Sequence, residues 1–94
     1  MASNTELQEW ITQAKQGNTT LIDQYFKQLY SRLEGKLLQQ FKSKDATQYY
    51  LCLAMAKFWE KFVHEDKPLP QTNWEAYFAS IAKNAYLDDL RKNN

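Results

Sequence analysis

The side chains with the clearest chemical potential lie near the end of the chain. An aromatic ring, a hydroxyl, an amide, an aliphatic side chain and a guanidinium follow one another at helical spacing: Tyr77, Ser80, Asn84, Leu87 and Arg91. Groups of these kinds in one row can stack on bases, hydrogen-bond to base edges and hold phosphate. Lys83 and Lys92 flank the row and would add phosphate contacts. The alternative is an ordinary solvated helix face, on which Asp88 pairs with Arg91 or Lys92.

The sequence has no pattern that is typical of an enzyme. It contains no glycine-rich phosphate loop, no Cys/His spacing for a metal and no nucleophile motif. We interpret His64 as a solvated residue or a favourable charge at a helix C-terminus, and Cys52 as a small apolar side chain. We therefore expect a protein that is not an enzyme and that needs no metal or cofactor.

Length and composition favour a single helical domain, residues 1–94. The 94 residues suffice for one domain, and 44% of them are hydrophobic. Two Gly and two Pro are few for the turns of a sheet protein and favour long helices. The net charge of +1 excludes a strongly basic nucleic-acid-binding tail. With one Cys and no apolar run of signal-peptide or membrane-span length, we expect a cytoplasmic protein without a membrane contact.

Hydrophobic periodicity predicts four helices joined by one long loop. The helices are expected at about residues 6–16, 19–42, 46–63 and 74–92, and the loop at about residues 64–73. Ser3 with Glu6 and Thr72 with Glu75 fit capping boxes, and Gly17 suits the left-handed stop after the first helix. We expect an all-α fold, a compact bundle of about four helices.

The third predicted helix carries apolar residues on two faces. At about 100° per residue, one stripe is predicted to face the core: Leu51, Ala54, Met55, Phe58, Trp59 and Phe62. The opposite side is also mostly apolar, with Tyr49, Cys52, Leu53 and Ala56. Either this helix is central and buried all round, or its second face docks on another protein.

The segment from Tyr77 to Lys92 resembles the region 2 signature of sigma-70-type RNA polymerase sigma factors, specifically the extracytoplasmic-function group. The matching residues are Ile81, Ala82, Lys83, Asn84, Asp88, Leu90, Arg91 and Lys92. Tyr77 stands where the family usually has Trp, and Phe78 where it has Leu. Weaker likenesses at residues 17–18, 25–26 and 57–62 extend the resemblance over nearly the whole chain.

The resemblance implies a helical bundle that binds the clamp helices of the polymerase β′ subunit. Such a domain recognises the promoter −10 element, melts it and captures the non-template strand, and an anti-sigma factor is a further expected partner. Residues expected to face DNA are Tyr77, Ser80, Lys83, Asn84, Arg91 and Lys92, with Trp74 as a minor candidate. The loop at residues 64–73 would lie where the family takes a flipped-out base.

The chain departs from the family on the third helix. The positions where the family has acidic and Gln residues for polymerase contact hold Ala46, Gln48, Tyr49, Cys52 and Leu53. We predict that this contact persists as a hydrophobic one, made by Gln48, Tyr49, Cys52, Leu53 and Ala56. The alternatives are that polymerase binding is weakened, or that the face meets another protein. In the latter case the chain would be a helical adaptor module that shares the bundle but no longer melts DNA. The chain also lacks room for the family's domain that reads the −35 element, so we expect a truncated sigma factor.

Overall fold

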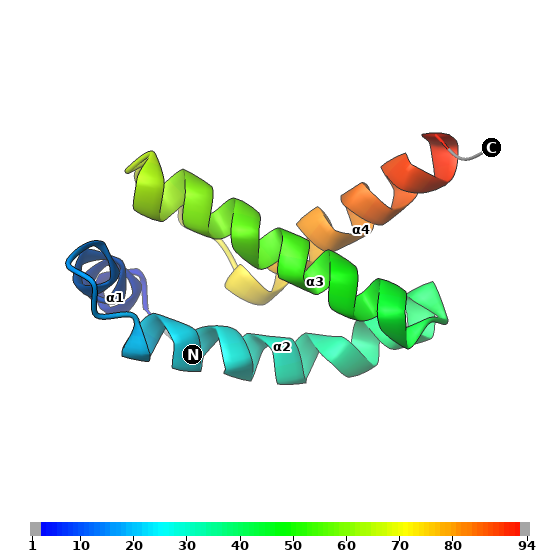
Figure 1. The fold of residues 1–94 in the computed structure, drawn as a ribbon, viewed down its shortest axis with the longest axis horizontal. Helices are drawn as coiled ribbons and strands as arrows, with labels where there is room; N and C mark the ends of the chain where they lie inside the picture. Colours follow the sequence, from blue (N-terminus) through cyan, green and yellow to red (C-terminus); the bar gives the residue numbers. More distant parts are fainter. Residues whose placement is uncertain (1–2, 93–94) are drawn as a thin grey trace.

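The computed structural model describes residues 3–92 and contains helices only (Figure 1). In chain order these are α1 (Asn4–Lys15), α2 (Thr20–Phe41), α3 (Lys44–Phe58), the π-helical segment η1 (Trp59–His64) and α4 (Trp74–Lys92). The predicted all-α fold of about four helices is therefore confirmed. No helix within residues 3–92 has the length and apolar character needed to cross a membrane.

Side-chain caps fix where the helices begin. Ser3 Oγ accepts a hydrogen bond from the Glu6 backbone N–H at 3.2 Å, as the predicted capping box requires. Ser43 Oγ accepts one from the Ala46 N–H at 3.2 Å, which starts α3 two residues earlier than predicted. After α1 the chain turns at Gly17, whose φ of +96° is one that residues with a Cβ rarely adopt.

The residue that caps α4 differs from the predicted one by one position. Asn73 Oδ1, and not the Thr72 hydroxyl, accepts the hydrogen bond from the Ala76 N–H, at 3.2 Å. Asn is as good a cap as Thr, because its short side chain reaches the same free N–H groups. The helix consequently begins at Trp74, as the periodicity predicted.

The third predicted helix does not keep α-helical geometry to residue 63. After Phe58 its turns widen into η1, and the Glu65 N–H donates to the Glu60 carbonyl, five residues back, at 2.9 Å. The wider turns bring two consecutive side chains, Phe62 and Val63, to the buried side. Periodicity with a fixed period of 3.6 residues could not predict this change.

The core is centred on α3, which packs against both α2 and α4 (Figure 1). The predicted stripe is buried at Leu51, Ala54, Phe58 and Phe62, whereas Met55 and Trp59 are half-buried. Two further α3 side chains, Thr47 and Tyr50, are buried without having been predicted. Tyr50 packs against Phe41 at the end of α2 and against Tyr86 on α4, contacts that no local pattern reveals.

Candidate functional site

The predicted row on α4 lies along one exposed face of a continuous helix. Ser80, Asn84, Leu87 and Arg91 are all exposed, and Leu87 keeps 48% of its surface accessible. The apolar positions of the same segment point the other way, because Phe78 and Ala82 are fully buried. The helix therefore separates a packing face from a face that is free to contact a partner.

The two aromatic residues at the start of α4 lie in different environments. Tyr77 is half-buried, with its ring centroid 5.0 Å from that of Trp74 and 6.1 Å from that of Phe62. Burial raises the pKa of the Tyr77 phenol, which keeps this group neutral. Trp74 is only 7% exposed, and its Nε1 donates to Asn4 Oδ1 at 2.9 Å. Trp74 is therefore too little exposed to stack on a base and is not among the residues proposed to contact DNA.

The charged residues beside the row are accessible. Arg91 Nη1 lies 4.0 Å from Asp88 Oδ1 in an exposed ion pair, which is the pairing that the solvated-face alternative predicts. Exposed pairs of this kind contribute about 0–1 kcal/mol, so a phosphate could displace Asp88. Lys92 is exposed, whereas Lys83 is half-buried and borders a small apolar hollow of about 170 Å³ beside Tyr86.

The second face of α3 is open to solvent. Gln48, Tyr49, Cys52 and Ala56 are exposed, with 58% of Tyr49 accessible. Leu53 differs from these, because it is half-buried and packs against the core. The alternative of a central helix that is buried all round is thus excluded within residues 3–92, and an apolar face remains for a partner.

One side-chain hydrogen bond joins α3 to α4, the helices that carry the open apolar face and the exposed row. The Tyr50 hydroxyl on α3 donates to Asp89 Oδ2 on α4 at 2.6 Å. This hydrogen bond, together with burial, raises the pKa of Tyr50 to about 12. The Tyr50 ring contacts Phe41, Tyr86 and Tyr49, with centroids 5.8, 5.6 and 4.8 Å away. Sequence analysis missed this contact, because its two partners are 39 positions apart.

The loop between η1 and α4 is tied to α1. Asn4 Nδ2 donates to the Pro70 carbonyl at 3.0 Å, and Lys15 forms an ion pair with Asp66. Residues 64–73 include no Phe, Tyr or Trp. A base held at this loop would therefore find its stacking surface elsewhere on the bundle.

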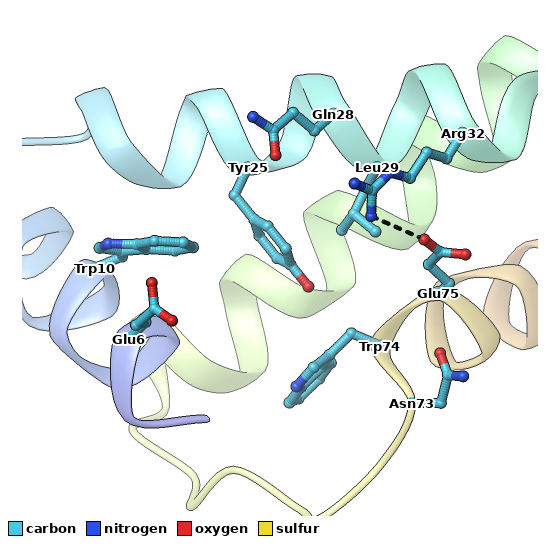
Figure 2. A pocket seen from close by; sticks show the side chains of 9 residues that line it. All are labelled: Glu6, Trp10, Tyr25, Gln28, Leu29, Arg32, Asn73, Trp74 and Glu75. Atoms are coloured by element: carbon cyan, nitrogen blue, oxygen red, sulfur yellow. Dashed lines mark hydrogen bonds and ion pairs between the residues drawn. The ribbon is translucent and has the colours of Figure 1, made fainter. Parts of the chain in front are cut away.

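A cleft that sequence analysis did not predict lies between α1, α2 and the start of α4 (Figure 2). Its volume is about 190 Å³, and it is lined by Glu6, Trp10, Tyr25, Gln28, Leu29, Arg32, Asn73, Trp74 and Glu75. Arg32 Nη1 lies 3.1 Å from Glu75 Oε1, so an ion pair closes one side. Three distant segments build this cleft, and none of them carries a recognisable motif. No group of side chains within residues 3–92 is arranged to hold a metal ion.

The Tyr50–Asp89 hydrogen bond predicts a pH dependence of stability. The phenol titrates near pH 10 in the unfolded chain and at about 12 in the folded one, so the folded state holds the proton more tightly. Its contribution is complete below pH 10 and is lost as the pH rises through 12. Urea unfolding followed by circular dichroism should show a smaller loss of stability on going from about pH 8 to about pH 11 in Tyr50→Phe than in the parent. Tyr49→Phe keeps the Tyr50–Asp89 hydrogen bond, the largest cause of the raised pKa of Tyr50, and should therefore still lose more stability than Tyr50→Phe. An equally steep loss in Tyr50→Phe would contradict the assignment.

The surfaces of the molecule itself are the basis on which a function can be inferred. No family model, curated protein sequence or solved structure matches the chain. The exposed row on α4, the open face of α3 and the cleft are therefore considered on their own chemistry.

Proposed function

We propose that the chain is a sigma-factor region 2-like domain that binds core RNA polymerase and recognises and melts the promoter −10 element. The observation that carries this proposal is the division of α4 into two faces. The resembling segment forms one helix that buries Phe78 and Ala82 and exposes Ser80, Asn84 and Arg91. A helix that reads DNA needs this arrangement, because its polar groups must reach the bases while its apolar groups anchor it.

When the domain binds DNA, the exposed row on α4 would contact a single strand. The Asn84 amide can donate to and accept from a base edge, and the accessible part of the Tyr77 ring can stack on a base. Lys83, Arg91 and Lys92 would contact phosphates, which position the strand without reading its sequence. The helix performs no chemistry on DNA, and the proposed domain needs no catalytic group or cofactor.

The polymerase contact is proposed on the open face of α3. Tyr49, Cys52 and Ala56 are exposed there, with Gln48 at the edge and Leu53 partly accessible. Complete burial of a fully exposed apolar side chain contributes about 1.5–3 kcal/mol, so a few partly exposed side chains such as Tyr49 can together anchor a partner. We propose the β′ clamp helices as that partner, with hydrophobic contact in place of the carboxylates of the family. This role would place the domain in the cytoplasm.

The open α3 face also favours a second candidate function. An adaptor module would use the same apolar residues to hold another protein and would have no need of the α4 row. An anti-sigma factor is a further partner that could cover this face. Binding of single-stranded DNA separates the two functions, because only the sigma-type domain requires it.

Polymerase capture tests the α3 face. We expect the chain to capture core RNA polymerase and Tyr49→Glu to reduce capture at least tenfold, because the new carboxylate would have to be desolvated against an apolar partner. Tyr49 is preferable to Leu53 for this test, because Leu53 packs against the core and its replacement would lower stability. Gln39→Glu adds the same charge at an exposed α2 position and should leave capture unchanged. Equal capture by all three proteins would show that α3 is not the contact, and no capture by the folded parent would favour the adaptor.

Salt dependence tests the phosphate contacts of α4. Fluorescence anisotropy with labelled single-stranded DNA, in the presence of core polymerase, should give affinity that falls as salt rises. Lys83→Ala should weaken binding about equally for all sequences and reduce the slope of log affinity against log salt by about 0.7. Lys27→Ala removes an exposed α2 charge away from the row and serves as the control. Identical slopes for the parent and Lys83→Ala would remove Lys83 from the DNA contact.

A further inference from the structure

Aromatic rings form much of the wall of the cleft between α1, α2 and the start of α4. The Trp10 and Tyr25 rings are 5.6 Å apart between centroids and tilted by 49°, and Trp74 lies on the opposite side (Figure 2). Trp10 lines the cleft and is only half-buried, so part of its indole is accessible. Ring faces carry negative electrostatic potential and attract cations.

A hydroxyl that lines this cleft forms no hydrogen bond within the described residues. Tyr25 is only 8% exposed, and its hydroxyl forms no hydrogen bond with any residue in the described part of the chain. Its hydroxyl end is directed toward the side of the cleft where Trp74 lies (Figure 2). Burial first, and then the charge of Glu75, raise the pKa of Tyr25 to about 12. The group stays protonated and neutral, with oxygen lone pairs available to a ligand.

Three charged residues line the cleft, and one of them is a carboxylate that has no counter-ion within residues 3–92. Arg32 is neutralised by Glu75 at 3.1 Å, and Lys36 Nζ lies 4.0 Å from the second oxygen of the same carboxylate. Glu6 forms no ion pair within residues 3–92, and its carboxylate contacts Ser3 Oγ at 3.4 Å. The Glu6 carboxylate points toward the Trp10 ring (Figure 2). A negative charge thus lies beside aromatic ring faces, which is the combination that recognises organic cations.

We propose that this cleft binds an organic cation, an alkylammonium or guanidinium group. The cation would lie against the faces of Trp10 and Tyr25 with Glu6 as its counter-ion, and a guanidinium N–H would donate to the Tyr25 hydroxyl oxygen. The volume of about 190 Å³ suits one such group, since a dry cavity of about 150 Å³ accommodates benzene. The cation could belong to a small molecule or to a basic side chain of a partner protein. The cleft lies outside the residues proposed to contact polymerase and DNA, so this inference is independent of the proposed function.

Nuclear magnetic resonance titration of the Trp10 indole N–H tests the site. Tetramethylammonium chloride should give a saturable shift with a millimolar dissociation constant, whereas neutral tert-butanol and matched sodium chloride should not. Glu6→Gln should weaken binding about tenfold, because it removes the counter-ion. Gln can replace Glu in the capping box, so α1 should still form. Glu9→Gln removes an exposed charge of α1 outside the cleft and should bind as the parent.

A second variant tests the hydroxyl separately. Tyr25→Phe keeps the ring, so it should bind tetramethylammonium, which has no N–H, as the parent does. The same variant should bind guanidinium, at millimolar concentration, several-fold more weakly. Equal shifts with tert-butanol, or unchanged binding in Glu6→Gln, would overturn the cation site, and unchanged guanidinium binding in Tyr25→Phe would overturn the role assigned to the hydroxyl. A blocked arginine peptide that binds tighter than free guanidinium would identify a protein side chain as the source, and equal affinity would indicate a small molecule.

Discussion

The packing of rings around Phe58 is the constraint on which the rest of the molecule depends. Phe58 is completely buried, and its ring centroid lies 5.6 Å from that of Phe26 on α2 and 4.9 Å from that of Phe62 in η1. On α4 it contacts Trp74 at 5.5 Å and Phe78 at 5.3 Å. One side chain thus joins three helical segments to α3. Because interiors are close-packed, this cluster fixes how α3 and α4 are rotated about their own axes, and therefore which of their faces remain exposed.

Polar contacts at the edge of the core hold α4 in place against its neighbours. Tyr50 with Asp89 holds the far part of α4, and Arg32 with Glu75 holds its first turn against α2. The Tyr50–Asp89 contact sets the position of α4 relative to α3, and hence the spacing between the two faces that we propose for DNA and polymerase.

Much of the fold and part of the candidate site could be predicted from the sequence. The helices, the Ser3 cap and the exposed α4 row follow from periodicity and from local capping chemistry, which act within a few residues. The features that were missed require contacts between distant segments or a local change of helical period. They are the Tyr50–Asp89 bond, the burial of Thr47, the widened turns of η1 and the cleft beside Trp10.

Whether α4 reads bases is the question that separates a sigma-type domain from an adaptor. The direct measurement is selection from a pool of single-stranded DNA with a randomised stretch, incubated with core polymerase in the presence and absence of the chain. We predict that the chain enriches a short motif and that Asn84→Ala loses the preference at one position of it, because the amide reads one base edge. Recovery of the same sequences with core polymerase alone, or an unchanged motif with Asn84→Ala, would contradict base reading by α4.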